Sequence, residues 1–418
     1  MLQRADENRI QNWIEGMDRF NATPGFGTTR ILFTGPELEN RAYVKEEMKK
    51  IGLTVSEDAI GNIFATLEGS DPSLAPVWTG SHIDTVPNAG KFDGMAGVVC
   101  GMEALRLIKE SGERHQRNLT VVVYTSEEPT RYGLSCLGSR AMSGDLTLEA
   151  TRYLTDQDKG SLYEKLQELG YDLNRFRDIK KSKNEVYASV ELHIEQNNRL
   201  EKRGAPIGIV EKICASSIFR VIVEGVQSHA GGTDMTERRD ALAASCEIAM
   251  RLEQLAKESK SEYNTATIGR ISVIPNAVNV IPGRTEFSID IRDCNMETKQ
   301  ELIQALMNEM DAIAKQRKVR VTVTEENDDE PLLCNPNVVA CIEKSCHGLG
   351  ISPEYMISGP YHDTLFVGRF APSAMIFVPS RKGISHSPEE WTDYKQLAVG
   401  TDVLVNTLLN LANLRESL

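Results

Sequence analysis

The chain has 418 residues, of which 40% are hydrophobic and 26% charged, a composition typical of a globular protein with room for two domains. Its net charge of −13 argues against nucleic acid or an anionic membrane surface as a partner, and no apolar run approaches the length of a membrane span. The N-terminus is polar, and the eight cysteines are scattered without a C-x-x-C pair. We therefore expect a soluble protein of the reducing cytoplasm.

The first elements alternate between helix and strand. Residues 9–20 and 37–51 have helical periodicity, and residues 54–55 and 63–66 have the pattern of short strands. This order is typical of the start of an α/β domain.

A strand-type run, residues 77–81, leads directly into His82 and Asp84. The H-x-D spacing puts both side chains on one face of the strand, so Asp84 is expected to hold the outer ring nitrogen of His82 while the other nitrogen binds a metal. Asp93 follows in a glycine-flanked turn before a helix-type run, where a carboxylate stays ionised and can bridge two cations. Alone, an H-x-D pair is more often a buried histidine tied to a carboxylate, so other residues must decide.

Glu127 and Glu128 follow the all-apolar, β-branched run 119–124, which is typical of a strand covered on both faces in a parallel sheet. Two adjacent carboxylates at the end of a buried strand repel each other unless cations compensate or one carboxylate turns away. Such pairs are common on solvated surfaces. This pair, however, lies at the carboxyl end of its predicted strand, as His82 does on another strand, which favours a functional role.

Two more histidines follow strand-type runs. After a polar, helix-rich excursion at 146–184, the run 186–190 leads to His193, and the buried run 373–378 is followed by His386. Open α/β sheets build their sites at the carboxyl ends of their strands. The sequence therefore predicts one site formed by side chains from several strand ends.

The pattern changes after Gly208. The expected elements are strands at 217–223, 267–273, 285–291 and 319–324 and helices at 240–257 and 296–316. Their β-α-β-β-α-β order predicts a ferredoxin-like unit, with the acidic run 325–331 as a solvated linker that closes it. The predicted domains are 1–208 with 328–418, and 209–327 as an insertion.

The residues gathered at the strand ends form the set that a two-metal hydrolase needs: His82, Asp93, Glu127, Glu128, His193 and His386. Nitrogen and carboxylate ligands without a thiolate suit zinc or manganese. Two cations would share Asp93 and lower the pKa of a water between them. One carboxylate of the glutamate pair must stay off the metals to take the proton from that water.

Seven blocks of the sequence carry a resemblance to a known family: 80–94, 126–138 (SEEPTRYGLSCLG), 191–196 (ELHIEQ), 228–238, 275–282 (PNAVNVIP), 289–293 (IDIRD) and 383–388. In this order, over nearly the whole chain, they resemble the amidase/hydantoinase/carbamoylase branch of the di-metal aminoacylase and carboxypeptidase superfamily. The resemblance implies an α/β, mixed-sheet catalytic domain with two divalent ions per subunit, Mn²⁺ or Zn²⁺. It also implies a homodimer in which the inserted ferredoxin-like α+β domain is both lid and dimer contact.

The resemblance further implies a role for each matching residue. His82 and His193 are implied to bind one metal, Glu128 and His386 the other, with Asp93 as bridge and Glu127 as general base. Gln196 is implied to contact a ureido group, His229 to stabilise the oxyanion, and Asn279 and Arg292 to hold a substrate carboxylate. An arginine fork matches a carboxylate and an oxyanion needs a preorganised donor. From the residues alone, Arg292 is equally well part of a strand-end ion pair and Asn279 a turn residue.

Two blocks of the sequence narrow the choice of substrate. Most allantoate and N-carbamoyl-amino-acid hydrolases read EEG and later SGAGHD, where this chain has EEPTRYG at 127–133 and SGPYHD at 358–363. These departures resemble the ureidoglycolate amidohydrolases, which convert ureidoglycolate to glyoxylate, ammonia and carbon dioxide in purine breakdown. Tyr361 and His362 are then expected at the pocket wall, with the Tyr361 hydroxyl paired to the hydroxyl of the substrate. The lid block 228–235 matches neither subgroup cleanly.

Other functions stay open at this point. An N-carbamoyl-L-amino acid hydrolase, a β-ureidopropionase or an allantoate amidohydrolase would use the same metal chemistry. A dipeptidase is a remoter alternative, against which Arg292 and Asn279 favour a small ureide with a carboxylate. A non-catalytic binding protein on the same scaffold is disfavoured by the complete ligand set and by Glu127.

Overall fold

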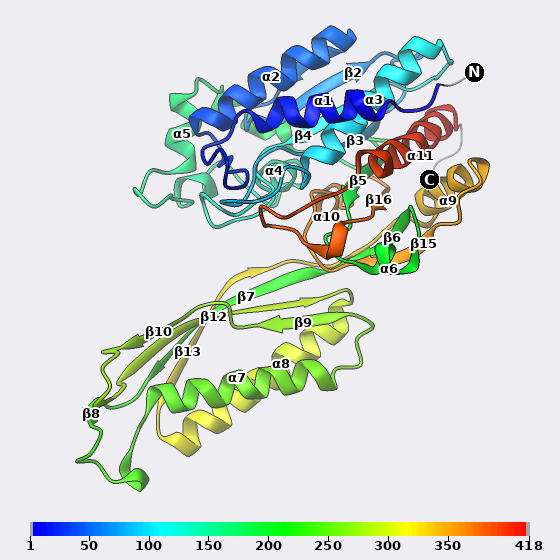
Figure 1. The fold of residues 1–418 in the computed structure, drawn as a ribbon. Helices are drawn as coiled ribbons and strands as arrows, with labels where there is room; N and C mark the ends of the chain where they lie inside the picture. The colour runs from blue at the N-terminus through cyan, green and yellow to red at the C-terminus, as the bar shows by residue number, and fades with distance from the viewer. Residues whose placement is uncertain (1–2, 415–418) are drawn as a thin grey trace. The chain divides into compact units, whose positions relative to one another are not determined.

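The computed structural model describes residues 3–414 and divides the chain into two compact units (Figure 1). Of the described residues, the first unit contains 3–211, 334–356 and 362–414, and the second contains 212–333 and 357–361. Within residues 3–414, no helix is both long enough and apolar enough to cross a bilayer.

The first unit alternates helices and strands over most of its length. Its helices are α1 (Glu7–Asp18), α2 (Gly35–Ile51), α3 (Met95–Ser111), α4 (Leu137–Ser143), α5 (Leu162–Glu168), α6 (Arg199–Arg203), α9 (Pro336–Gly348), α10 (Thr364–Val367) and α11 (Tyr394–Asn413). Its strands are β1 (Thr54–Glu57), β2 (Ile63–Leu67), β3 (Val77–His82), β4 (Leu119–Tyr124), β5 (Ala188–Ile194), β6 (Gly208–Ile213), β15 (Glu354–Ser358) and β16 (Ser373–Val378), with the chain crossing to the second unit within β6 and β15.

The sheet of the first unit runs in the order β1-β2-β4-β3-β5-β16-β6. Its four central strands, β4, β3, β5 and β16, are parallel, whereas β1, β2 and β6 are antiparallel to their neighbours. The prediction of a mixed α/β sheet is therefore confirmed. Because the central strands are parallel, their carboxyl ends meet at one edge.

The central strands are buried on both faces, as their continuous apolar runs predict. On one face α3 packs against β3 and β5, and α11 and α1 pack against α3 (Figure 1). Every residue of α3 from Met95 to Ile108 is buried, which explains why this stretch is apolar apart from Glu103 and Arg106, which form an ion pair. On the other face α4 and α10 pack together over a cluster that contains Trp78, Tyr124 and Phe370.

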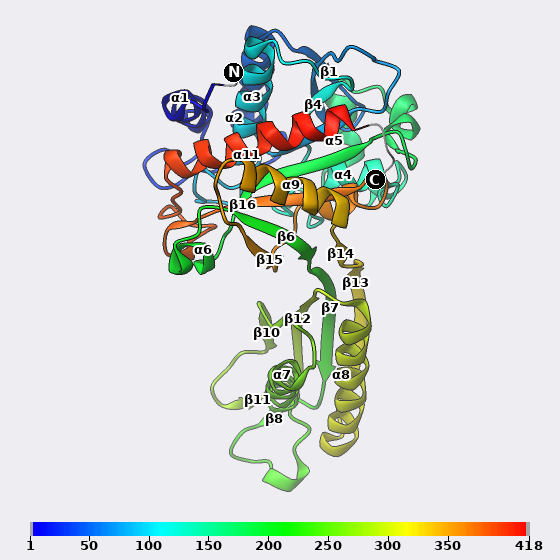
Figure 2. The ribbon, with the colours of Figure 1, turned by 90° about the vertical axis from the view of Figure 1, so that its right-hand side faces the viewer.

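The second unit is an antiparallel sheet with two helices on one face (Figure 2). Its elements are β7 (Ala215–Glu224), β8 (Ser228–His229), α7 (Ala241–Glu258), β9 (Asn264–Thr267), β10 (Ile271–Ile274), β11 (Val280–Ile281), β12 (Arg284–Asp293), α8 (Met296–Arg317), β13 (Arg320–Asp328) and β14 (Leu332–Leu333). The order β10-β12-β7-β13 is that of a ferredoxin-like unit, with β9 also paired to β12. Alternate residues of β12 are buried under α7 and α8, as period-2 patterning requires.

Two local predictions for this unit are wrong. The expected strand 267–273 is broken into β9 and β10, which pair with opposite ends of β12. The acidic run 325–331 is not wholly a linker, because β13 continues to Asp328 along β7 after a register shift between Glu325 and Asn327. An edge strand with one solvated face tolerates acidic residues, and the ammonium of Lys299, whose side chain is buried, lies 2.9 Å from Asp328.

Candidate metal centre

The metal-capable side chains predicted in the first unit lie at the carboxyl ends of the four central parallel strands. His82 ends β3, Glu127 and Glu128 follow β4, His193 lies near the end of β5, and His386 follows β16. The strand around His193 extends to Ile194, further than the sequence indicated. Sheet topology thus explains how residues more than 300 positions apart in the chain come together.

Asp93 lies at the centre of this group. Its Oδ1 is 3.2 Å from Nε2 of His193 and 3.7 Å from Nε2 of His82, and its Oδ2 is 3.1 Å from Nε2 of His386. Glu128 Oε1 is 3.3 Å from the same nitrogen of His386. The five predicted ligands therefore form two groups of ligand atoms, each within 4.8 Å: His82, Asp93 and His193, and Asp93, Glu128 and His386. These two groups share the Asp93 carboxylate, and a third group joins His193 to Glu191 and His362.

The ring orientations of two histidines are fixed by main-chain carbonyls. His193 Nδ1 donates to the carbonyl of Ile194 at 2.9 Å, and His82 Nδ1 donates to the carbonyl of Asp84 at 3.1 Å. In each ring Nε2 is thereby turned toward Asp93, and after loss of its proton the same nitrogen presents a lone pair to a metal. Gly94 allows this approach, since a Cβ at its position would lie 2.5 Å from the His82 ring.

The role predicted for Asp84 needs a correction. Its carboxylate is 3.6 Å from Nδ1 of His82, beyond hydrogen-bond distance, because the main-chain carbonyl of the same residue takes that position. The carboxylate instead accepts the backbone N–H groups of Glu127 and Glu128, at 3.2 and 3.1 Å. Asp84 therefore positions the glutamate pair and not only the histidine.

The carboxylates of the site have unequal proton affinities. Although burial opposes ionisation, hydrogen bonds from the three histidines hold the pKa of Asp93 well below its usual range. Burial and the charge of Glu128 raise the pKa of Glu127 well above its usual range. The hydrogen bonds to Asp93 and Glu128 raise the pKa of His386 to about 11. Histidine protons thus partly neutralise a buried acidic cluster, and a divalent cation fits the same nitrogen and oxygen donors.

Three further side chains surround Asp93. The sequence did not indicate two of them, Ser385 and Glu390, and the third, Gln196, was predicted to have another role. Glu390 accepts the backbone N–H groups of Phe92 and Asp93, both at 3.0 Å. Ser385 donates to Glu390 at 2.7 Å and lies 3.1 Å from Asp93 Oδ2, and Gln196, expected at a ureido group, donates to the same oxygen at 2.8 Å. Glu390 belongs to an acidic pair, Glu389 and Glu390, that closely follows His386, and this pair was the feature of the sequence that could have indicated it.

His362 and Tyr361, adjacent in sequence, belong to different units. The buried His362 ring packs edge-on against His193, with 4.6 Å between centroids, and burial lowers its pKa well below the usual range. The Tyr361 hydroxyl donates to Asp329 at 2.7 Å and lies 3.2 Å from the Asn327 amide. The predicted pairing of this hydroxyl with a substrate hydroxyl would have to replace these bonds.

The predicted lid residues lie in two places within the second unit. His229 and Asn279 are exposed neighbours, because β8 pairs with β11 and the Ala230 N–H donates to the Asn279 carbonyl at 3.0 Å. Arg292 lies at the opposite end of β12 from Arg284, about 26 Å along an extended strand. Figure 1 shows β8 at one end of this unit and β9, which pairs with the Arg292 end of β12, toward the other. In this chain Arg292 is paired to Asp290, with Nη2 2.9 Å from Oδ2.

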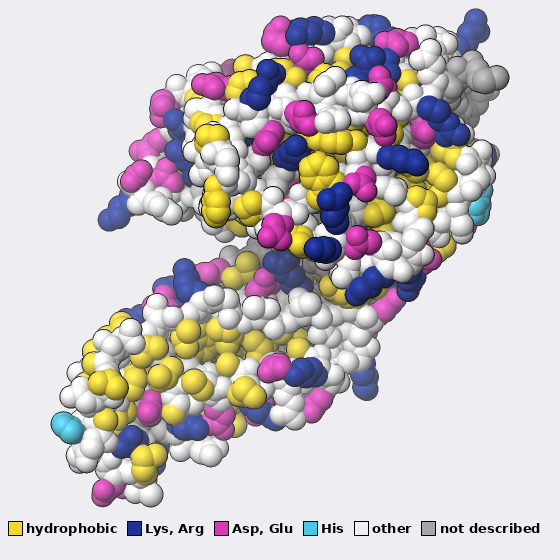
Figure 3. Space-filling view, in the orientation of Figure 1, with side chains coloured by type: hydrophobic (Ala, Val, Ile, Leu, Met, Phe, Trp, Pro, Cys, Tyr) yellow, Lys and Arg dark blue, Asp and Glu magenta, His cyan; other side chains and the backbone are white. Residues whose placement is uncertain are grey.

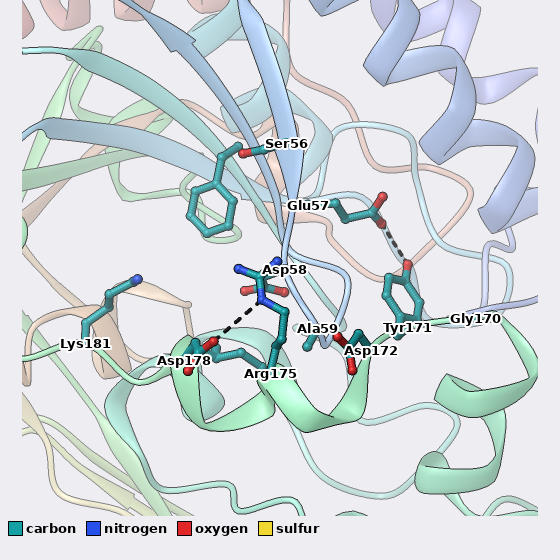
Figure 4. A pocket seen from close by; sticks show the side chains of 12 residues that line it. Ser56, Glu57, Asp58, Ala59, Gly170, Tyr171, Asp172, Arg175, Asp178 and Lys181 are labelled. Atoms are coloured by element: carbon teal, nitrogen blue, oxygen red, sulfur yellow. Dashed lines mark hydrogen bonds and ion pairs between the residues drawn. The ribbon is translucent and has the colours of Figure 1, made fainter.

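A separate cavity of about 500 Å³ opens in the first unit (Figure 4). Its wall includes Glu57, Tyr171, Arg175, Asp178 and Lys181. These side chains are partly occupied with one another, since Tyr171 donates to Glu57 at 2.7 Å and Arg175 lies 3.6 Å from Asp178. None of the groups of metal-capable side chains among the described residues includes a residue of this wall. The cavity wall and the candidate metal ligands therefore have no residue in common.

The fold and the ligand groups define a metal-dependent hydrolase with an inserted ferredoxin-like unit. The chain belongs to peptidase family M20/M25/M40, whose profile matches residues 78–410. It is 38% identical over 413 residues to a ureidoglycolate hydrolase of Arabidopsis thaliana, covering 97% of this chain and 87% of the relative. An N-carbamoyl-L-amino acid amidohydrolase of Geobacillus stearothermophilus is also 38% identical, over 93% of this chain and 94% of the relative.

Solved structures agree with this assignment. AtUAH, solved in complex with (S)-hydroxyglycine, has a TM-score of 0.88 and 38% identity, with 98% of each chain covered. A tripeptidase from Staphylococcus aureus is alike in fold alone, with 18% identity and a TM-score of 0.71, over 98% of this chain and 100% of that one. The protein is therefore an amidohydrolase, an enzyme that cleaves linear amide C–N bonds.

Proposed function

We propose that each subunit binds two divalent cations, Mn²⁺ or Zn²⁺, in the two ligand groups. His82 and His193 would hold one ion and Glu128 and His386 the other, with Asp93 shared between the two groups. This proposal rests on the sharing of Asp93 between two groups of ligand atoms. When bound, the ions supply Lewis acidity that polarises the scissile carbonyl and acidifies water.

Glu127 is the general base of the proposed reaction. Its Oε2 is 3.9 Å from Nε2 of His82, so it faces the site, yet it belongs to neither ligand group. Burial and the neighbouring Glu128 raise its pKa well above the usual range, which suits a group that must accept a proton. Glu127 takes a proton from the attacking water and delivers it to the leaving nitrogen.

The proposed substrate is a short ureido acid, with ureidoglycolate as first choice. Hydrolysis of its ureido group would give glyoxylate, ammonia and carbon dioxide. The observation that carries this choice is the match to a protein named ureidoglycolate hydrolase, which extends over 97% of the chain, against 93% for the equally identical N-carbamoyl-L-amino acid amidohydrolase. The blocks 127–133 and 358–363 agree with it, since Pro360 and Tyr361 add bulk that disfavours the second ureido arm of allantoate.

A second candidate is an N-carbamoyl-L-amino acid, because the Geobacillus relative with that activity in its name is equally identical to this chain. Comparative kinetics separate the two candidates. For metal-loaded protein, kcat/KM measured by ammonia release should be higher for ureidoglycolate than for allantoate, N-carbamoylglycine or a dipeptide. Faster turnover of N-carbamoyl amino acids would transfer the assignment to the carbamoylases and leave the metal chemistry intact.

We also propose a cytoplasmic homodimer formed through the second unit. Its edge strand β10 exposes Ile271 and Ile274, and Met250 of α7 is 65% exposed. Figure 3 displays hydrophobic side chains on the surface between β10 and α7. Exposed apolar patches and unpaired strand edges of this kind favour association with another chain.

The homodimer gives each of the lid residues a role in one site. His229 and Asn279 lie by β8 and β11, beyond the Arg284 end of β12, and Arg284 and Arg292 are about 26 Å apart along that strand, so one small substrate cannot contact all three within one chain. Arg292 pairs in register with Ser216, close to the point where the chain enters the second unit. We infer that His229 and Asn279 act on the substrate of the neighbouring subunit, a different molecule from the one that Arg292 of the same chain holds.

A further inference from the structure

Two cysteines of the second unit lie opposite each other at the ends of two neighbouring strands, outside the metal centre. Asp293 of β12 pairs with Ala215 of β7, and the next residues outward in this antiparallel register are Cys294 and Cys214. Directly opposed residues point to the same face of an antiparallel sheet. The register therefore places the two thiols side by side.

The backbone hydrogen bonds identify the type of this pair. The Cys214 N–H donates to the Ser358 carbonyl and the Cys294 N–H to the Tyr263 carbonyl, so both amides point away from the partner strand. Cys214 and Cys294 are thus a non-hydrogen-bonded pair, in which the Cα atoms are about 4.5 Å apart and the side chains approach closely. Disulfides span Cα separations of about 4.4–6.8 Å, so the backbone needs little movement to allow one.

The two thiols are chemically unequal. A hydrogen bond from Cys214 lowers the pKa of Cys294 to about 6, supported by Ser261 and the Tyr263 N–H and opposed by burial and by Asp293. The same hydrogen bond and burial raise the pKa of Cys214. At neutral pH Cys294 is therefore the thiolate, the reactive form, and Cys214 keeps its proton. Cys294 retains 7% exposure, whereas Cys214 has none.

We propose that Cys214 and Cys294 are a redox-active pair that forms a reversible disulfide with a small peroxide as oxidant. The Cys294 thiolate attacks one peroxide oxygen, the O–O bond breaks, and with one proton the products are a sulfenic acid and water. The Cys214 sulfur then attacks the Cys294 sulfur, its proton leaves with the hydroxyl as a second water, and the S–S bond forms. Two thiols are oxidised by two electrons and the peroxide is reduced.

The bond would join β7 to β12 at their ends and close most of the second unit into one covalent loop. Closing a loop restricts the unfolded chain, so the oxidised protein should unfold at a higher temperature than the reduced protein. A thiol reductant should reverse both the bond and the shift. Transient, reversible disulfides are the kind that a reducing compartment permits.

The test is mild hydrogen peroxide treatment of the full-length Cys246→Ser protein, which lacks the exposed cysteine of α7. Its intact mass should fall by about 2 Da, the mass of two hydrogens. Non-reducing tryptic mapping should join peptide 213–220 to peptide 293–299, since Lys212, Arg220, Arg292 and Lys299 are the flanking cleavage sites. Dithiothreitol should restore the two separate peptides and the lower unfolding temperature.

The matched variants are Cys214→Ser and Cys294→Ser in the same background. In the first, Cys294 should still react and retain the oxidised sulfur as a sulfenic acid that a dimedone probe labels. In the second, neither the cross-link nor the label should form at Cys214. The proposal is overturned if wild-type protein shows no joined peptide under conditions that oxidise Cys246, or if Cys214 reacts first.

Discussion

At the scale of single residues, the two adjacent glutamates after β4 have different proposed roles, Glu128 as a metal ligand and Glu127 as the general base. Replacing Glu127 with Gln should leave metal content near two ions per subunit and lower kcat by about 10²–10⁴-fold, because proton transfer is lost while both ligand groups stay complete. Replacing Glu128 with Gln should instead lose metal, because Glu128 belongs to a ligand group. Metal analysis beside steady-state kinetics measures both effects. The assignment is inverted if both variants keep their metal and only the Glu128 variant is inactive.

Asp84 acts through the backbone of this pair. In Asp84→Asn one oxygen can still accept one of the two N–H groups, but the new amide faces the other, so Glu127 and Glu128 should shift. Metal affinity or kcat should fall about 10–100-fold, as is typical for residues that orient metal ligands. Asp240→Asn is the control, since Asp240 also accepts two backbone N–H groups but belongs to the second unit, which contains none of the metal ligands. Equal effects of the two variants on metal affinity would contradict the role of Asp84.

At the scale of secondary-structure elements, the strand ends were predictable and several contacts around them were not. Apolar runs that end at His82 and shortly before Glu127 and His386 reveal the sheet and its active edge, because a strand that is buried on both faces is apolar throughout. The partner of a given carboxylate depends on loops that the pattern does not constrain. Glu390, which binds the backbone at Asp93, therefore escaped prediction, as did the bond from Gln196 to Asp93.

In the second unit, too, the order of the elements was predictable and the details of strand pairing were not. Its β-α-β-β-α-β order follows from periodicity, but the break between β9 and β10 and the extension of β13 through acidic residues depend on pairing with β12 and β7. The distance between Asn279 and Arg292 was also not evident from sequence. Both residues lie in motifs of the same family, and only the length of β12 shows that they lie far apart within one chain.

The β3–β4 pairing depends on one glycine. Gly80 has φ of 147°, and a Cβ there would lie 1.9 Å from the Val122 carbonyl oxygen on β4. Gly80→Ala should therefore destabilise the fold by at least about 2 kcal/mol and disturb His82, two residues further along. Gly348→Ala at the end of α9 meets no atom within 4 Å and should change stability by no more than about 0.5 kcal/mol. Denaturant unfolding of both variants measures the difference, and equal midpoints would refute this reading of the strand.

At the scale of the whole molecule, the long axis of the second unit is the reason to expect shared active sites. If His229 serves the neighbouring subunit, the variants Glu127→Gln and His229→Ala should each be nearly inactive as homodimers, because every site then lacks one of its two groups. A hybrid dimer contains one site with both defects and one site with none. Complementation between two inactive variants therefore distinguishes a composite site from one built within a single chain.

Mixing equal amounts of the two variants and allowing subunit exchange should recover about a quarter of the wild-type rate, because about half of the dimers are hybrids with one intact site in two. Exchange is verified independently by native mass spectrometry of subunits that differ in mass. A mixture of Glu127→Gln with Glu128→Gln serves as control and should recover nothing, since both residues belong to the same subunit's metal centre. If verified hybrids of Glu127→Gln and His229→Ala stay inactive, each site is complete within one chain, and the roles of His229 and Asn279 must be reassigned.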